Sequence, residues 1–99
     1  MRIVILGAGR VGSHLAKMLR GEENDITIID DNDARLSKLR TSIDVRTMQG
    51  NPSSTLILKK AGVDKCDLFI AVYPAELQET NIVGALLAKR LGAAKVLAR

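Results

Sequence analysis

Aromatic side chains are almost absent from this sequence of 99 residues, which contains Phe69 and Tyr73 and no tryptophan. Because 46% of the residues are nevertheless hydrophobic, the core has to be built from aliphatic side chains. Proteins that bind single-stranded nucleic acid stack its bases on aromatic side chains. In this sequence no aromatic residues are interspersed among the lysines and arginines. The lysines and arginines are spread along the chain, mostly near predicted helix ends, where cations complement the helix dipole. We therefore expect no nucleic-acid partner, despite the net charge of +4.

Cysteine and histidine are each present once, as Cys66 and His14. A single cysteine cannot form an internal disulfide, and a single histidine gives no metal cluster, so we interpret Cys66 as a packing residue. The longest apolar runs fall far short of the roughly 20 residues that span a bilayer. Met1 is followed by Arg2 and a strand-like run, without a secretory signal. We expect a cytoplasmic domain with no direct membrane insertion.

Short apolar runs alternate with segments of helical periodicity along the whole chain. The runs predict strands over residues 3–6, 26–29, 44–48, 68–72 and 95–98. The periodic segments predict helices over 10–20, 33–40 and 74–90, and a short one that follows the turn at 50–54 and runs to residue 60. We expect Asp33 to cap the second helix, with Leu36 and Leu39 facing the core, and Pro74 to open the last one.

This alternation predicts an α/β fold, a doubly wound parallel sheet of the Rossmann type with about five strands and with helices on both faces. The length suits one domain over residues 1–99. Because the sequence stops in or just after the fifth strand, we expect a fragment of a longer protein, truncated before a sixth strand, or a chain that ends at a domain edge.

A Gly-x-Gly-x-x-Gly string lies between the first strand and the first helix, where a dinucleotide-binding loop belongs. In such a loop the first glycine permits a tight turn, the second lets phosphate approach the backbone, and the third lets the helix pack on the strand. The free amides at the helix start then receive the phosphate groups. The predicted phosphate-binding residues are Gly7, Ala8, Gly9, Arg10, Val11 and Gly12.

Asp30 ends the second strand, 21 residues after Gly9, which is the spacing of the acid that binds the adenosine ribose. Its charge would repel a 2′-phosphate, so we predict NADH over NADPH. The alternative is that the glycines only turn and pack, with Asp30 a capping acid. Arg10 is unfavourable for the dipole at a helix start, so we predict that it grips a phosphate; the alternative is a solvated arginine.

No acid–base pair or activated nucleophile stands out, so we predict no catalytic turnover. Asp30, Asp31 and Asp33 lack the glycine and the distal glutamate of a calcium loop, which makes a metal site improbable. Glu76 and Glu79 suit an exposed helix start.

The chain resembles the TrkA N-terminal domain, also called the RCK or KTN domain, which regulates potassium channels and transporters. Three stretches carry the likeness: residues 1–12 with the helix that follows, residues 26–30, and the run from 79 to 83 together with 87–93 and 96–99. The first two are shared with many dehydrogenases, whereas the third is much less widely shared.

The resemblance implies a domain that binds NAD(H), ATP or ADP and acts on a membrane potassium transporter or channel subunit. It also implies pairing into a homodimer or a higher ring, at the inner face of the cell membrane. The family commonly has an acid after Gly50 and a Thr or Ser after the fourth strand. Here these positions hold Asn51 and Tyr73, so the resemblance does not define which nucleotide binds. The further cofactor-binding residues that it implies are Asp31, Asn51, Val72, Tyr73 and Arg99.

The helix predicted over 74–90 has more apolar surface than one packing stripe requires. We expect Ile82, Val83, Leu86 and Leu87 to cover the sheet. Ala85, Ala88 and Leu91 should extend the apolar surface toward a partner copy. The alternative is a central helix covered by the rest of a complete domain.

Three functions remain open from the sequence. The first is a regulatory nucleotide-binding domain of a potassium transport system, without catalysis. The second is the cofactor domain of an NAD-dependent dehydrogenase that lacks its substrate domain, and the third is a nucleotide-binding assembly module. The sequence that follows residue 99 in the gene would distinguish the first two, because a dehydrogenase needs a catalytic domain.

Overall fold

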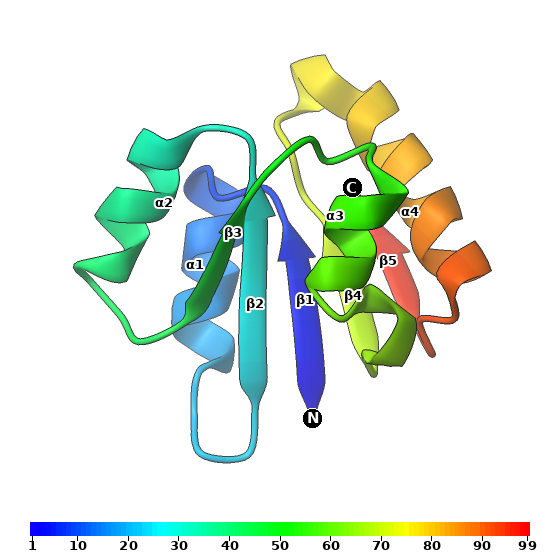
Figure 1. The fold of residues 1–99 in the computed structure, drawn as a ribbon. Helices are drawn as coiled ribbons and strands as arrows, with labels where there is room; N and C mark the ends of the chain where they lie inside the picture. The colour runs from blue at the N-terminus through cyan, green and yellow to red at the C-terminus, as the bar shows by residue number, and fades with distance from the viewer.

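Five parallel strands form a single sheet in the order β3-β2-β1-β4-β5 (Figure 1). The computed structural model describes residues 1–99. Strand β1 is central and pairs with β2 on one side and β4 on the other, all in parallel register. The strands are β1 (Arg2–Leu6), β2 (Asp25–Asp30), β3 (Arg46–Gln49), β4 (Leu68–Ala71) and β5 (Val96–Ala98). This order confirms the predicted doubly wound fold.

Helices cover both faces of the sheet, as right-handed crossovers between parallel strands require (Figure 1). Helices α1 and α2 lie on one face, and α3 and α4 lie on the other. Two short 3-10 turns, η1 and η2, precede β4 and α4. The bounds are α1 (Arg10–Leu19), α2 (Asp33–Arg40), α3 (Thr55–Lys60), η1 (Val63–Lys65), η2 (Ala75–Leu77) and α4 (Gln78–Leu91).

Alternate residues of the strands point to two separate aliphatic cores. In β1, Ile3 and Ile5 belong to the core under α1 and α2, whereas Val4 and Leu6 belong to the core under α3 and α4. All four side chains are at most 3% exposed. A strand buried on both faces carries no polar residue, which explains the unbroken apolar run in the sequence.

Three local predictions were wrong in detail. Asn32, rather than Asp33, caps α2: its backbone is extended, and its side chain accepts a hydrogen bond from the Arg35 amide at 3.1 Å. The third strand begins at Arg46, because pairing with β2 starts there, opposite Thr27. Pro74 opens the 3-10 turn η2, closed by a 2.8 Å bond from the Leu77 amide to the Pro74 carbonyl, and α4 begins only after this turn.

The face of α4 that covers the sheet is also different from the one predicted. Asn81, Gly84 and Ala88 are buried, whereas three of the four large residues assigned to that face are exposed. The helix lies so close to β1 that a Cβ atom at Gly84 would be 2.5 Å from Leu6 Cδ2. Only small side chains fit at that distance, so the large ones point outward. Those exposed are Ile82 at 49%, Val83 at 40% and Leu86 at 64%.

Candidate functional site

The loop after β1 is shaped by two glycines that the fold itself requires. Gly7 has φ +112°, which favours glycine, and its amide donates to the Ile29 carbonyl at 2.8 Å. A Cβ atom at Gly12 would lie 1.7 Å from the Gly7 carbonyl oxygen. These two residues therefore let α1 start directly against the end of β1, in the arrangement that the sequence pattern predicts.

Gly9 is different, because nothing lies within 4 Å of the position that its Cβ would occupy. It is the N-cap of α1 and supplies no side-chain cap. The first bond of the helix runs from the Ser13 amide to the Gly9 carbonyl at 2.9 Å, so the amides of residues 10–12 have no helical acceptor. The first turn also holds no acid. Open space faces unpaired amides here, which is the chemistry of an anion site.

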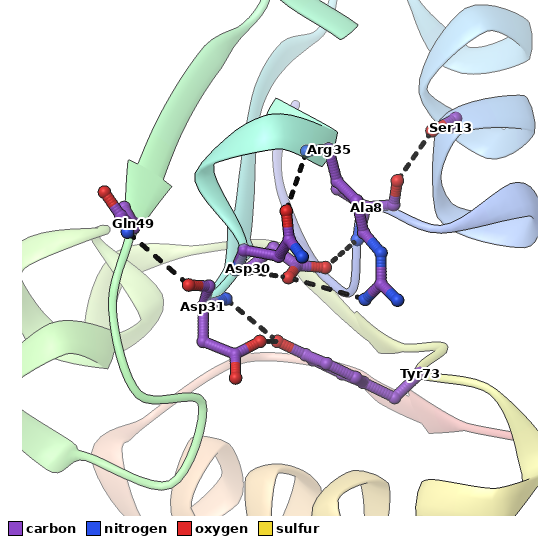
Figure 2. A network of polar contacts seen from close by, with 8 residues as sticks. Ala8, Ser13, Asp30, Asp31, Arg35, Gln49 and Tyr73 are labelled. Carbon is purple, nitrogen blue, oxygen red and sulfur yellow. Dashed lines mark hydrogen bonds and ion pairs between the residues drawn. The ribbon is translucent and has the colours of Figure 1, made fainter. Parts of the chain in front are cut away.

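Asp30 ends β2 beside this loop and is fully buried. One carboxylate oxygen accepts from the Ala8 amide and the other from the Asn32 amide, both at 2.8 Å. The guanidinium of Arg35 lies over it, with Nη1 3.7 Å from Oδ1 (Figure 2). Asp30 thus holds the phosphate loop against the start of α2, and Arg35 covers it from solvent.

Tyr73 reaches from the end of β4, across the end of β1, to the segment that follows β2 (Figure 2). Its hydroxyl accepts from the Asp31 amide at 3.3 Å and donates to the Asp31 carboxylate at 3.1 Å. Burial of the ring, together with the charge of Asp30, raises the pKa of the Tyr73 phenol above its ordinary value. The phenol stays protonated and acts as a crosslink at the carboxyl edge of the sheet.

Two cavities open at this edge. The first, of about 830 Å³, lies between α1 and α2 and begins at the phosphate loop. Its wall contains residues 8–11, Ser13, Leu15, Leu39 and Ser42, and the basic side chains His14, Lys17, Arg35 and Lys38. The second, of about 560 Å³, follows β3 and is lined by Asp31, Gln49, Gly50, Asn51, Pro52, Ser53 and Thr80.

The structure brings together most of the predicted site residues but not all of them. Ala8, Gly9, Arg10 and Val11 line the first cavity, and Asp31 and Asn51 line the second. Val72 is buried, and its amide donates to the Leu6 carbonyl. Arg99 lies beyond β5, where its amide donates to the Ala71 carbonyl, and it lines neither cavity.

Sequence reasoning missed several residues of the cavity walls, among them Arg35, Lys17, Lys38 and Thr80. Arg35 could have been found from its position in the first turn after Asp30, within reach of that carboxylate. Lys17 and Lys38 were interpreted as dipole partners at helix ends, which they are, but they also face one another's helix across the first cavity. Thr80 carries no local signal, because α4 meets the segment after β3 only in three dimensions.

Other features bear on chemistry without adding a site. Cys66 is buried, as predicted, and burial raises the pKa of its thiol. No group of three or more His, Cys, Asp and Glu side chains is placed to hold a metal ion. None of the helices combines the length and the apolarity needed to cross a bilayer.

A glycine loop at the start of a helix, a buried acid on the neighbouring strand and the strand order 3-2-1-4-5 together define a Rossmann-type domain, a class that binds nucleotides at this edge of the sheet. The family model of the TrkA-N domain matches residues 3–99, and the chain belongs to this family.

Its relatives include proteins of potassium uptake. The chain is 43% identical over 91 residues to the Trk system potassium uptake protein TrkA of Halomonas elongata, a match that covers 92% of this chain and 20% of that protein. The TrkA protein of Haemophilus influenzae is 45% identical over 83 residues, which is 84% of this chain and 18% of that protein. The chain thus spans about a fifth of the length of these curated relatives.

Two solved structures share the fold at low sequence identity. The TrkA-N domain of the inner membrane protein ybaL from Escherichia coli has a TM-score of 0.68 at 21% identity, with 98% of this chain and 86% of that chain covered. The Kef CTD of Shewanella denitrificans, in an AMP-bound form, has a TM-score of 0.78 at 20% identity, with 100% of this chain and 58% of that chain covered.

Proposed function

We propose that this chain is a regulatory domain without catalysis, which binds NAD(H) or an adenine nucleotide and passes the state of that site to a membrane potassium transporter or channel subunit. The observation that carries the proposal is the row of unpaired amides at the start of α1, next to the buried Asp30. Membership of the TrkA-N family and relatives named as potassium uptake proteins support the regulatory role. The domain then works in the cytoplasm, at the inner face of the membrane.

The phosphates of the nucleotide bind the amides of residues 10–12, with Arg10 as a fork beside them. Arg10 is exposed and has no ion pair in the molecule, so it is free to contact a phosphate. The ribose binds Asp30. Because that carboxylate is fully buried under Arg35, a ribose hydroxyl reaches it only when the arginine swings aside. Arg35 is itself 43% exposed, and at 3.7 Å its Nη1 makes no hydrogen bond to the carboxylate that would hold the side chain in place.

This movement of Arg35 bears on nucleotide choice. The charge of Asp30 disfavours a 2′-phosphate, and we propose that NADH binds better than NADPH by about 1–3 kcal/mol. A displaced Arg35 can contact a 2′-phosphate and so reduces the difference. Arg35→Ala should therefore increase the preference for NADH, and Asp30→Ala should decrease it. Equal dissociation constants for the two cofactors in the parent chain would contradict this assignment.

Gly9→Val is the sharpest test of the site. Apart from the two neighbouring residues, nothing lies within 4 Å of a Cβ atom at this position, so the variant should fold, and we expect its side chain to fill the space in front of the free amides. Gly21→Val is the matched control, because a Cβ there is equally unobstructed and Gly21 lies beyond the other end of α1. Calorimetry with NADH, ATP, ADP and AMP should show binding by the parent and the control and none by Gly9→Val. Unchanged affinity in Gly9→Val would sink the proposal.

The absence of turnover is part of the proposal. The one phenol at the edge of the sheet is hydrogen-bonded to Asp31 and has a raised pKa, which unsuits it as a proton donor or base near neutral pH. Hydride transfer from NADH to small carbonyl compounds, followed by absorbance, should not rise above the rate without protein. A steady rate would favour the cofactor domain of a dehydrogenase instead.

We also propose that the chain pairs with a second copy through α4. Its outward residues Ile82, Val83 and Leu86 form an apolar face, which Leu77, 46% exposed, extends at the end of η2. Contiguous apolar surface of this kind is seldom left in contact with water. A two-fold axis would bring the same face of both copies together.

A further inference from the structure

The first cavity contains basic side chains that extend well beyond the phosphate loop. On α1, Arg10, His14 and Lys17 follow one another at intervals of four and three residues, which places them on one side of the helix. All three line the cavity, and Arg35 and Lys38 of α2 line it from the opposite wall. We call this basic surface between the two helices the α1–α2 groove.

The cations of the α1–α2 groove are almost entirely unpaired. The molecule has three ion pairs, and only the one between Arg35 and Asp30 involves a residue of the groove. Arg10, Lys17 and Lys38 contact no carboxylate, and no Asp or Glu lines the cavity. Cations gathered in a hollow without acids produce a positive potential that concentrates multivalent anions.

The groove is too long to be used by the phosphates at the loop alone. Arg10 and Lys17 are seven residues apart, which is about 10 Å along a helix. A phosphate held by the amides at the start of α1 is therefore out of reach of Lys17. The volume of about 830 Å³ lies within the range of roughly 300–1,000 Å³ that small-molecule sites occupy, which favours a small ligand over a protein segment.

We propose that the α1–α2 groove is a second anion site, which binds a small molecule carrying several phosphate groups. Lys17 and Lys38 hold phosphate groups at the far end as point charges, and Arg35 contributes a planar fork nearer the loop. The site lies beside the nucleotide proposed above. Its far end is distinct from the nucleotide site, because the loop does not use Lys17 or Lys38, whereas Arg35 lies between the two sites.

The test compares two double variants that remove the same charge from opposite faces of the sheet. Lys17→Gln/Lys38→Gln empties the far end of the groove, and Lys59→Gln/Lys60→Gln removes two exposed lysines from α3. Inorganic tripolyphosphate is titrated into each chain by calorimetry at about 0.15 M salt, where surface charges more than about 8 Å away are screened. AMP is titrated in parallel, and circular dichroism confirms that each chain folds.

We expect the groove variant to weaken tripolyphosphate binding by roughly tenfold or more, as for the loss of charge-assisted hydrogen bonds, while AMP binding changes by less than about threefold. The control should change tripolyphosphate binding by less than about twofold. In Gly9→Val, AMP binding should be lost and tripolyphosphate binding retained. If AMP does not bind the parent chain but tripolyphosphate does, the proposed nucleotide function fails and the second anion site stands.

Four outcomes would overturn the second anion site. The first is that tripolyphosphate does not bind the parent chain at millimolar concentration, which would mean that the cations are simply solvated. Equal weakening by the groove variant and the control would show attraction to net charge alone. Loss of AMP together with tripolyphosphate in the groove variant would make the groove part of the nucleotide site. Tighter binding of a glutamate-rich peptide than of tripolyphosphate would assign the groove to a protein segment.

Discussion

The helices on the two sides of the sheet present opposite chemistry to solvent. Helices α1 and α2 leave the basic α1–α2 groove, whereas α4 leaves an apolar face of Ile82, Val83 and Leu86. The inner sides do not differ in this way, because each buries a core cluster of 11 residues against the sheet. Packing therefore explains the inner residues of both sides and leaves the outer ones free to specialise. Our proposals assign small anions to one side and a second copy of the chain to the other.

The largest expected effect on stability comes from Gly12 and Gly84, the glycines at which α1 and α4 approach β1 most closely. Gly12→Ala places a Cβ atom 1.7 Å from a backbone oxygen that cannot move without breaking the phosphate loop. We expect it to lose about 4 kcal/mol or more of unfolding free energy, or to fail to fold. Gly84→Ala meets only the end of the Leu6 side chain, at 2.5 Å. Overpacking of about 1–3 kcal/mol is partly offset there by the helix propensity of alanine, about 1 kcal/mol.

Chemical denaturation of both variants measures this difference between the two sides. If Gly12→Ala were as stable as Gly84→Ala, the close approach of α1 to the end of β1 would be wrong, and with it the geometry of the loop.

The second largest effect is expected at Asn81, which fastens α4 to the end of β4. Its side chain accepts from the Tyr73 amide at 2.8 Å and donates to the Tyr73 carbonyl at 3.0 Å, and all of it is buried. Asn81→Leu leaves two buried main-chain groups unpaired, at a cost of about 1–3 kcal/mol each. Thermal and urea unfolding should show a loss of about 3 kcal/mol. Gln78→Leu, exposed on the same helix, is the control and should lose less than about 0.5 kcal/mol.

A smaller effect is expected at alkaline pH, and its sign follows from the raised pKa of Tyr73. Below about pH 10 the phenol is protonated in the folded and the unfolded chain alike. Above that pH the unfolded chain ionises first, so the free energy of unfolding falls as pH rises, by up to about 1.4 kcal/mol per pH unit. Cys66, whose pKa burial also raises, contributes with the same sign from about pH 9.

Tyr73→Phe isolates the contribution of the phenol. Near pH 7 it should lose about 1 kcal/mol with its bonds to Asp31, and between pH 9 and about pH 11 its unfolding free energy should fall less steeply than that of the parent. Parallel curves for the two chains over this pH range would mean that the ring is not buried as described.

The smallest effect on stability is expected on the apolar face of α4. Ile82→Gln/Leu86→Gln removes side chains that are 49% and 64% exposed, so the unfolding free energy of a single chain should change by less than about 0.5 kcal/mol per residue. The association of two copies should nevertheless be lost, and light scattering at micromolar concentration measures it. If the full-length protein without these substitutions is monomeric under the same conditions, this face of α4 is not a contact surface between copies.

The parts of the site that are local in sequence could be predicted, and the parts assembled by the sheet could not. The glycine loop and Asp30 are each defined by their position against one strand end, and strand ends are visible as apolar runs. The contact between Tyr73 and Asp31 joins residues 42 positions apart. It forms because the strands that precede them, β4 and β2, lie on either side of β1 in the sheet.

The error on α4 has a different cause. The prediction assumed that the largest apolar residues face inward, which holds when a helix stands at an ordinary distance from its sheet. Here Gly84 and Ala88 bring the helix closer, and the large residues are turned outward. The α1–α2 groove was missed for a related reason, since the spacing of basic residues on one helix does not show which second helix faces it.

Asn81 imitates a neighbouring strand. A single amide side chain supplies the donor and the acceptor that a paired strand would offer to Tyr73, so two hydrogen bonds join the end of β4 to a helix. Tyr73 in turn binds Asp31, the residue directly after Asp30. A shift of α4 would have to lengthen these two hydrogen bonds or move Tyr73 with the helix. The adjoining residues Ile82 and Val83 are exposed, so a contact on the outside of α4 would lie next to the side chain that connects this helix, through Tyr73, to the β2–α2 segment.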